Sequence, residues 1–318
     1  MPTPIKGRDK LIKEIKPKFI EHYKSFCPNY DKFIDYSFSY PRQAIRVNTL
    51  KTTPAKVKKS MTKQGWILKQ VPWCKQGFFI THKEDRRDIG NTPEHALGYI
   101  FVQDAASMIP PLVLDPKPGE TILDMCAAPG SKATQIAQYM KNKGVLIAND
   151  YKGIRLAALG INMQRLGITN NVITLMEGKY FKEFEFDRIL VDAPCSGTGT
   201  IRKSLKTTKQ WSINLLKNLS GIQRQLLRTA FENLKSGGTL VYSTCSCEPI
   251  ENEAVVSWLL ENYPNAEIEN IKIKGLKSSP PIMEFDKTKY NPQVKNCLRI
   301  WPYDNDTEGF FVTKITKK

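Results

Sequence analysis

Residues 121–139 read TILDMCAAPGSKATQIAQY, and this stretch decides the fold. An apolar strand turns through small residues, Pro129 and Gly130 directly into a helix. Small residues let the backbone come close to a ligand, and the first turn of a helix presents amide groups without partners. The stretch therefore predicts a ligand-binding loop at the end of a sheet, with a purely structural turn as the alternative.

Short apolar strands and amphipathic helices alternate after this stretch. Strands are expected at 144–150, 171–176, 187–194 and 239–244, and helices at 153–167, about 210–234 and about 251–262. Residues 235–238 (KSGG) read as a turn, and residues 297–302 and 309–315 as a terminal antiparallel pair. The alternation predicts an α/β, Rossmann-like parallel sheet with helices on both faces, in which ligands bind beyond the carboxyl ends of the strands.

The N-terminal part has a different character. Residues 1–38 read as basic helices, and residues 43–82 as strand, helix, strand and strand, a small RRM-like α+β module. Five aromatic residues of the helical part form an apolar stripe, which predicts packing rather than ligand stacking: Phe19, Tyr23, Phe26, Tyr30 and Phe33. We divide the chain into a basic N-terminal region, residues 1–95, and a Rossmann-like domain, residues 96–318.

Positive charge is concentrated near the N-terminus. Of the formal net charge of +17, residues 1–90 account for +12, from 20 Lys/Arg against 8 Asp/Glu, and the other 228 residues for +5. A basic platform of this kind gains affinity for a phosphate backbone through counterion release. A solvated, lysine-rich surface without a nucleic-acid partner is the alternative.

Composition excludes several classes of protein. No stretch approaches the roughly 20 apolar residues of a membrane span, and the N-terminus lacks the apolar core of a signal peptide, so we expect a soluble, cytoplasmic protein. An odd number of cysteines, seven, indicates reduced thiols. With three histidines and no CxxC pair, no metal site is expected.

The loop at residues 126–132 matches neither the GxGxxG of dinucleotide binding nor a P-loop. The next strand ends about twenty residues later at Asp150, where a carboxylate can accept hydrogen bonds from both hydroxyls of a ribose. Arg155 follows and can orient Asp150 or reach the ligand. A simple helix cap is the alternative for Asp150, but the combination fits S-adenosylmethionine better than NAD or ATP.

Two cysteines follow predicted strands in similar strings, LVDAPCSGTGT around Cys195 and LVYSTCSCEP around Cys245. They can pair, bind a metal, serve as small core residues or divide a reaction between them. A thiolate that adds to carbon 6 of cytosine makes carbon 5 nucleophilic, and a second thiol can assist the later release. Asp192 can bond the amino group and stabilise protonation at the adjacent ring nitrogen. On chemical grounds either thiol can attack.

Three motifs in this order, DMCAAPGSK (124–132), DAPCSGTGT (192–200) and YSTCSCEPIENE (242–253), resemble the NOL/NOP/Sun family of RNA cytosine-C5 methyltransferases. The resemblance extends over about residues 40–318. It implies a Rossmann-like, S-adenosylmethionine-dependent methyltransferase fold, with Cys245 as the nucleophile and Cys195 in product release. Lys132 and Asp192 then lie between cofactor and base, and Cys247 is incidental.

The resemblance also implies the residues that hold the cofactor: Cys126, Ala127, Ala128, Pro129, Gly130, Ser131, Lys132, Asp150, Arg155 and Asp192. One departure concerns the acidic residue that often follows the third strand and contacts adenine. This chain reads MEGKYF there, and Glu177 is the candidate substitute.

These observations lead to the hypothesis of an RNA 5-methylcytosine methyltransferase whose N-terminal region binds RNA. An unstacked base is required for attack, and tRNA is favoured over rRNA by analogy with compact archaeal members. Arg46 and Asn48 are candidate RNA contacts, with a strand salt bridge and a turn as structural alternatives. The rival hypotheses are an rRNA enzyme, a non-catalytic RNA-binding or ribosome-assembly factor, and a methyltransferase for DNA cytosine or another RNA base.

Overall fold

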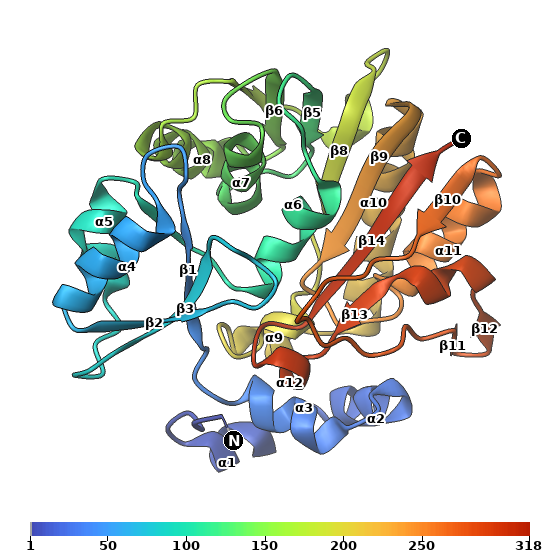
Figure 1. Ribbon diagram of the computed structural model, residues 1–318. Coiled ribbons are helices and arrows are strands. Elements are labelled where there is room, and N and C mark those ends of the chain that lie inside the picture. Colours follow the sequence, from blue (N-terminus) through green and yellow to red (C-terminus); the bar gives the residue numbers. More distant parts are fainter. Residues whose placement is uncertain (1) are drawn as a thin grey trace.

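The computed structural model describes residues 2–318 and contains a large sheet and a small sheet, with helices of the large domain between them (Figure 1). The large sheet has the strand order β10-β14-β9-β8-β5-β6-β7, and β13 pairs with β14. Its strands are β5 (Thr121–Asp124), β6 (Val145–Asp150), β7 (Asn171–Leu175), β8 (Phe186–Asp192), β9 (Leu234–Thr244), β10 (Ala266–Glu269), β13 (Leu298–Ile300) and β14 (Phe310–Lys317).

The five strands β9, β8, β5, β6 and β7 are parallel, which confirms the Rossmann-like fold. β14 lies antiparallel to β9 and to β13, so the expected terminal pair is present and is part of the large sheet. The helices that pack around the sheet are α6 (Ile109–Leu114), α7 (Ser131–Tyr139), α8 (Gly153–Leu166), α10 (Ile213–Glu232) and α11 (Glu253–Asn262). The first three share one apolar core and the last two another, as expected for a sheet covered on both faces.

Two details differ from the sequence prediction. The helix expected at about 210–234 is α10, which begins at Ile213 because Ser212 is extended and its side chain caps Leu215 N at 3.2 Å, but the short helix α9 (Lys206–Gln210) that precedes it was not predicted. The KSGG turn does not precede its strand but lies within β9. Phe186 pairs with Leu234 and Arg188 with Thr239, so the four residues between them form a wide bulge.

The small sheet is antiparallel with the order β2-β3-β1-β4. Its elements are β1 (Gln43–Val47), α4 (Pro54–Lys63), β2 (Trp66–Gln70), β3 (Gly77–His82) and β4 (Ile100–Val102). The predicted order of strand, helix, strand and strand is therefore present. The fourth strand comes from residues beyond 95, where sequence analysis ended the N-terminal region, because β4 completes the edge beside β1.

The N-terminal helices pack on the large domain rather than on the small sheet. They are α1 (Arg8–Lys13), α2 (Pro17–Phe26) and α3 (Tyr30–Ser37), the blue helices below the large sheet in Figure 1. Phe19, Tyr23 and Phe33 are fully buried and share a core with Trp211 and Trp301. The aromatic stripe is therefore packing, as expected.

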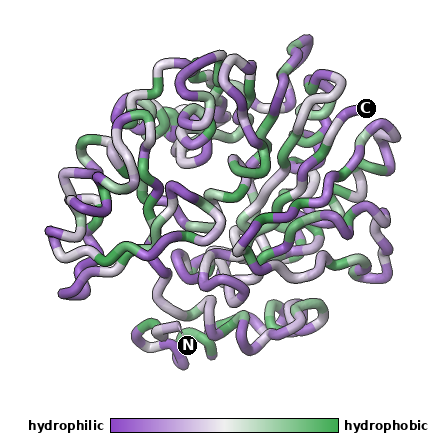
Figure 2. Tube along the Cα trace, viewed as in Figure 1, coloured by the Kyte–Doolittle hydropathy of each residue, from purple (hydrophilic) through white to green (hydrophobic). Residues whose placement is uncertain are grey.

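The hydropathy pattern follows this architecture. In Figure 2, hydrophobic segments trace the strands of the large sheet, and hydrophilic segments mark the loops around the outside of the molecule. Within residues 2–318, no helix combines the length and the apolar character that crossing a bilayer demands.

Candidate active site

The carboxyl ends of β5, β6, β8 and β9 bring the predicted site residues to one edge of the large sheet, because these strands are parallel neighbours. The loop after β5 carries residues 126–130, β6 ends at Asp150 and β8 ends at Asp192. Cys245 directly follows β9. Motifs that are widely separated in the sequence thus share one site.

Arg46 and Asn48 support this site from the small sheet and do not reach RNA. Both side chains are fully buried. The Arg46 guanidinium donates to Ser131 O at 2.7 Å and to Thr134 Oγ1 at 2.9 Å, at the start of α7. Asn48 Nδ2 donates to Leu166 O at 2.8 Å and to a neighbouring carbonyl. The prediction of RNA contacts is wrong, because strand β1 faces α7 and α8 rather than solvent. Within residues 2–318 Arg46 forms no salt bridge, whereas the turn expected as the alternative for Asn48 is present, with Leu50 N donating to Asn48 Oδ1 at 3.1 Å.

Two side chains of helix α8 donate hydrogen bonds to carbonyl groups of the loop at 126–130. Asn162 Nδ2 donates to Pro129 O at 2.9 Å, and the Arg155 guanidinium donates to Ala128 O. Arg155 Nη1 also lies 3.0 Å from Asp150 Oδ2. This ion pair is compatible with the orienting role predicted for Arg155 toward Asp150, and the same side chain contacts the loop.

A cavity of about 380 Å³ adjoins this loop at the ends of β5 and β6. It is lined by Met125, Cys126, Asn149, Tyr151, Glu177, Gly178, Lys179, Pro194, Leu219, Ile222, Gln225 and Leu226. Its apolar walls and few polar groups suit a flat heterocycle. Glu177 lies at this cavity, where its half-exposed carboxylate is 2.6 Å from Lys179 Nζ.

Asp124, the last residue of β5, is a site residue that sequence analysis missed. Its side chain is buried and neither carboxyl oxygen has a hydrogen-bond partner. Burial raises the pKa of Asp124 to about 8, and the nearby carboxylate of Asp192 adds to the effect, whereas Lys132 opposes it. A buried carboxyl group that has no hydrogen-bond partner and lies beside the loop at 126–130 can bind a cationic or hydrogen-bonding ligand. Its sequence signal was the same strand-end position that identified Asp150.

The two thiols face each other, with 3.4 Å between Cys195 Sγ and Cys245 Sγ. The hydrogen bond with Cys245, followed by burial, raises the pKa of Cys195 well above its usual range. Either sulfur can be the donor in this contact. The side chains of Lys132 and Lys203 both lie close enough to Cys245 to interact with it electrostatically.

Asp192 is oriented by two donors. Lys132 Nζ lies 2.7 Å from Asp192 Oδ2, and Ser243 Oγ donates to Oδ1 at 2.8 Å. Burial alone would lower the pKa of Lys132, but the Asp192 carboxylate overcomes this and raises it. Lys132 also lies 5.3 Å from the centroid of the Phe310 ring. The carboxylate is thus paired with Lys132 and fixed by Ser243, and its contact with a base remains a prediction.

A second ion pair, between Lys203 and Glu308, was not predicted. The two side chains are in contact, and their backbones are linked to Cys245 because Gly199 N donates to Cys245 O at 3.0 Å and Gly309 N to Gly199 O at 2.9 Å. Burial, together with the charge of Asp104, raises the pKa of Glu308 to about 7. The weak sequence signal was the acidic residue of the terminal EGFF.

Cys247 lies outside the thiol pair. Its side chain is buried in the core that the N-terminal helices share with Trp301, and burial raises its pKa well above the usual range. All seven cysteines are free thiols, and residues 2–318 contain no group of three or more metal-ligating side chains. The expectation that Cys247 is incidental agrees with its position.

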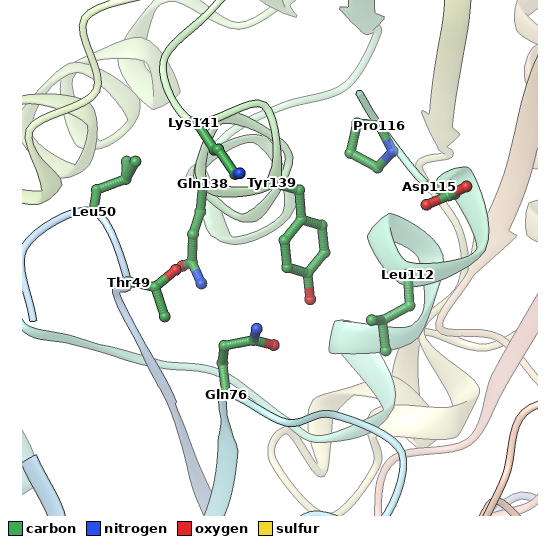
Figure 3. Close-up of a pocket in the computed structure, with 9 residues that line it drawn as sticks. All are labelled: Thr49, Leu50, Gln76, Leu112, Asp115, Pro116, Gln138, Tyr139 and Lys141. Carbon is green, nitrogen blue, oxygen red and sulfur yellow. The ribbon is translucent and has the colours of Figure 1, made fainter. Parts of the chain in front are cut away.

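A larger cavity, of about 670 Å³, lies between the small sheet and helices α6 and α7 (Figure 3). Gln76, Gln138 and Tyr139 point into it, and Leu50 and Leu112 lie at its sides. None of the predicted site residues lines this cavity, so size alone does not identify the active site.

Comparisons with known proteins agree with this geometry. Residues 111–316 match the family model described as 16S rRNA methyltransferase RsmB/F, and residues 15–105 match the N-terminal domain of 16S rRNA methyltransferase RsmF. A tRNA (cytosine(49)-C(5))-methyltransferase from Pyrococcus abyssi is 44% identical over 309 residues, covering 96% of this chain and 97% of that protein. Ribosomal RNA small subunit methyltransferase F from Shewanella denitrificans is 39% identical over 96% of this chain, which spans 61% of that protein.

Two solved structures show the same fold. A methyltransferase homologue from Pyrococcus horikoshii has a TM-score of 0.86 at 37% identity, with 98% of each chain covered. NSun6 from Pyrococcus horikoshii, determined with SFG, has a TM-score of 0.82 at 23% identity and covers 95% of this chain and 98% of that one. At that identity the second likeness concerns the fold alone.

Proposed function

Because the chain belongs to the RsmB/F methyltransferase family, we propose that it transfers a methyl group to carbon 5 of a cytosine in RNA. The observation that carries the proposal is the pair of thiols 3.4 Å apart beside the Lys132–Asp192 ion pair. A protein that only binds RNA needs neither the second thiol nor a lysine-paired carboxylate held next to it. The rival hypothesis of a non-catalytic factor leaves this arrangement without a purpose.

S-adenosylmethionine is the proposed methyl donor, and the residues present suit it. The unpartnered carboxyl group of Asp124 offers a site for a cationic amino group, whose charge would favour loss of the Asp124 proton, and Asp150 faces the same edge of the sheet for ribose hydroxyls. The cavity beside Cys126 suits adenine. When bound, the cofactor supplies an electrophilic methyl group on a sulfonium. SFG, the S-adenosylmethionine analogue in the NSun6 structure, supports this choice by analogy of fold.

Cys245 is the proposed nucleophile. Its thiolate adds to carbon 6 of cytosine. The electron pair of the 5,6 double bond then forms a double bond between carbons 4 and 5, and nitrogen 3 takes up the displaced pair, which gives an enamine that is nucleophilic at carbon 5. Asp192 holds the amino edge of the base, and the charge of Lys132 stabilises the electron density that accumulates there. After methyl transfer, the carbon 5 proton must leave, and the carbon–sulfur bond must break to return the Cys245 thiolate.

Cys195 is the proposed base for this second half of the reaction. Its contact with Cys245 is the largest cause of its raised pKa. Once Cys245 is bonded to carbon 6 it is a thioether, so this cause is removed and the pKa of Cys195 should fall, while burial still raises it. The base therefore becomes available when the adduct has formed, which orders attack before release.

We propose tRNA as the substrate rather than rRNA. The P. abyssi tRNA methyltransferase matches this chain over nearly the full length of both proteins. The rRNA methyltransferase F of S. denitrificans continues well beyond the matched part, since this chain spans 61% of it. Residues 1–95, with their excess of basic residues, form the proposed RNA-binding region.

The experiment is methyl transfer from S-adenosylmethionine to total tRNA and to small-subunit rRNA, with bisulfite sequencing to locate 5-methylcytosine. The wild-type protein should methylate tRNA. Cys245→Ala should abolish transfer but retain cofactor binding in calorimetry. Full activity of Cys245→Ala would refute the assigned nucleophile, and absence of transfer to any RNA would refute the enzyme.

A further inference from the structure

Glu251 joins the two loops that carry the thiols. It lies between β9 and α11 and is fully buried. Its Oε1 accepts Ser196 N at 2.8 Å, and its Oε2 accepts the hydroxyl of Ser196 and that of Ser246 at 2.5 Å. Ser196 directly follows Cys195, and Ser246 directly follows Cys245. One carboxylate is therefore bonded to the neighbour of each thiol.

Helix α10 completes this arrangement through Gln223. Gln223 Nε2 donates to Glu251 Oε1 at 3.1 Å. It also donates at 2.9 Å to the carbonyl oxygen of Pro194, the residue before Cys195. Tyr242 at the end of β9 donates its hydroxyl to Glu251 O at 2.6 Å. Glu251 is thus fixed by the sheet and by a long helix, so it can hold the two loops in a defined relation.

We propose that Glu251 is a positioning residue that sets the separation of Cys195 and Cys245, so that product release can follow attack. Without its bonds to both loops, the loops would still meet at Gly199 and Cys245, where one backbone hydrogen bond joins them at 3.0 Å. On the side that contains Ser196 and Ser246, their hydroxyls would remain 3.1 Å apart and Thr198 Oγ1 would still accept Cys247 N at 3.0 Å, but the charged acceptor that bonds both loops would be lost. The catalytic consequence rests on the proposed methyl transfer, whereas the thiol separation can be measured without RNA.

The first test measures how readily the two thiols form a disulfide in the full-length protein. Diamide accepts the two electrons and two protons that the thiols lose, and peptide mass spectrometry identifies the Cys195–Cys245 bond. A displacement of about 1 Å at a reacting pair can cost on the order of a hundredfold in rate. We expect Glu251→Gln to form the bond roughly tenfold more slowly than the wild-type protein, because an amide has one acceptor atom and cannot serve both the serine hydroxyls on Oε2 and the N–H donors of Ser196 and Gln223 on Oε1.

Glu94 provides the matched control. It is also buried, and its Oε1 accepts a serine hydroxyl, that of Ser60, at 2.5 Å and Gln64 Nε2 at 2.7 Å, but it lies in the small module. Glu94→Gln should leave the disulfide rate unchanged. Ser246→Ala removes one of the two hydroxyl bonds and should give an intermediate rate. A rate for Glu251→Gln equal to that of the wild-type protein would overturn the proposal.

The second test measures catalysis with tRNA. Glu251→Gln should lower kcat, leave KM for S-adenosylmethionine unchanged and raise the fraction of protein that runs as a covalent RNA adduct on denaturing gels. A loss of folded protein alone would lower kcat without raising that fraction. If the wild-type protein methylates no RNA, the proposed function fails while the disulfide rates still decide the role of Glu251.

Discussion

At the scale of single residues, Asp124 shows that the site is built at a cost to stability. Its pKa is about 8 in the folded protein, against an ordinary value near 4, because of burial and then Asp192, with Asp150 adding to the effect and Lys132 opposing it. The folded state therefore holds this proton more tightly than the unfolded chain. The free energy of unfolding should fall as pH rises from about 4 to about 8 and then level off.

Asp124→Asn should remove this destabilisation. The variant should be more stable than the wild-type protein by an amount that grows to a few kcal/mol near pH 8, since each pKa unit corresponds to about 1.4 kcal/mol. Urea unfolding of the cofactor-free protein between pH 5 and 8 measures the difference, and a difference independent of pH would contradict it. Asp31→Asn, at an exposed position, is the control. The same Asp124→Asn protein should bind S-adenosylmethionine more weakly.

The sequence allowed the residues of the proposed reaction to be predicted, but not the residues that hold them in position. Cys195, Cys245 and Asp192 were predicted because a two-step attack on cytosine requires such groups, and the structure brings them together. Arg46 looked like an RNA contact because a cation in a basic region usually faces solvent. Only the packing of β1 against α7 shows that it bonds the start of this helix, and such long-range pairing has no local sequence signal. Glu251 went unnoticed for the same reason.

At the scale of elements, α2 is tied to the loop that follows β9. His22 Nε2 lies 2.7 Å from Glu248 Oε2, and Trp211 Nε1 donates to Oε1 at 2.8 Å. Glu248 is fully buried, and its N–H donates to Ser246 Oγ next to Cys245. The N-terminal helices therefore brace the thiol loop as well as covering the aromatic core. Periodicity predicted these helices, but not the surface on which they pack.

His22→Ala should destabilise the protein by about 1–3 kcal/mol, because it leaves a buried carboxylate short of a partner. It should also lower methyl transfer at temperatures where the fold persists, since the loop beside Cys245 loses its brace. Urea unfolding and initial rates measure the two effects. Ser25→Ala on the same helix removes only an exposed hydrogen bond to His22 O and should change neither. Equal effects from both variants would mean that helix α2, and not its contact with Glu248, is what matters.

At the scale of the whole molecule, the proposed RNA-binding region and the candidate active site lie in different parts of the chain. The order of strands and helices predicted the large sheet and its ligand-binding edge, because parallel strands allow few topologies. The small sheet takes a strand from beyond residue 95, and this pairing could not be foreseen from a composition boundary. Most of the excess positive charge lies in residues 1–90, whereas the thiols and acidic side chains of the site lie in the large domain.

Helix α4 allows this division to be tested. Four of its lysines are exposed: Lys56, Lys58, Lys59 and Lys63. If they bind phosphates, replacing all four with Gln should weaken tRNA binding and reduce the slope of log K against log salt concentration by about 0.7 to 0.9 for each phosphate that is no longer neutralised. Filter binding at several salt concentrations measures the slope. Because α4 packs on β2 and contributes no residue to the thiol site, S-adenosylmethionine affinity and the rate of Cys195–Cys245 disulfide formation should not change. An unchanged salt slope would show that the RNA lies on another surface of the protein.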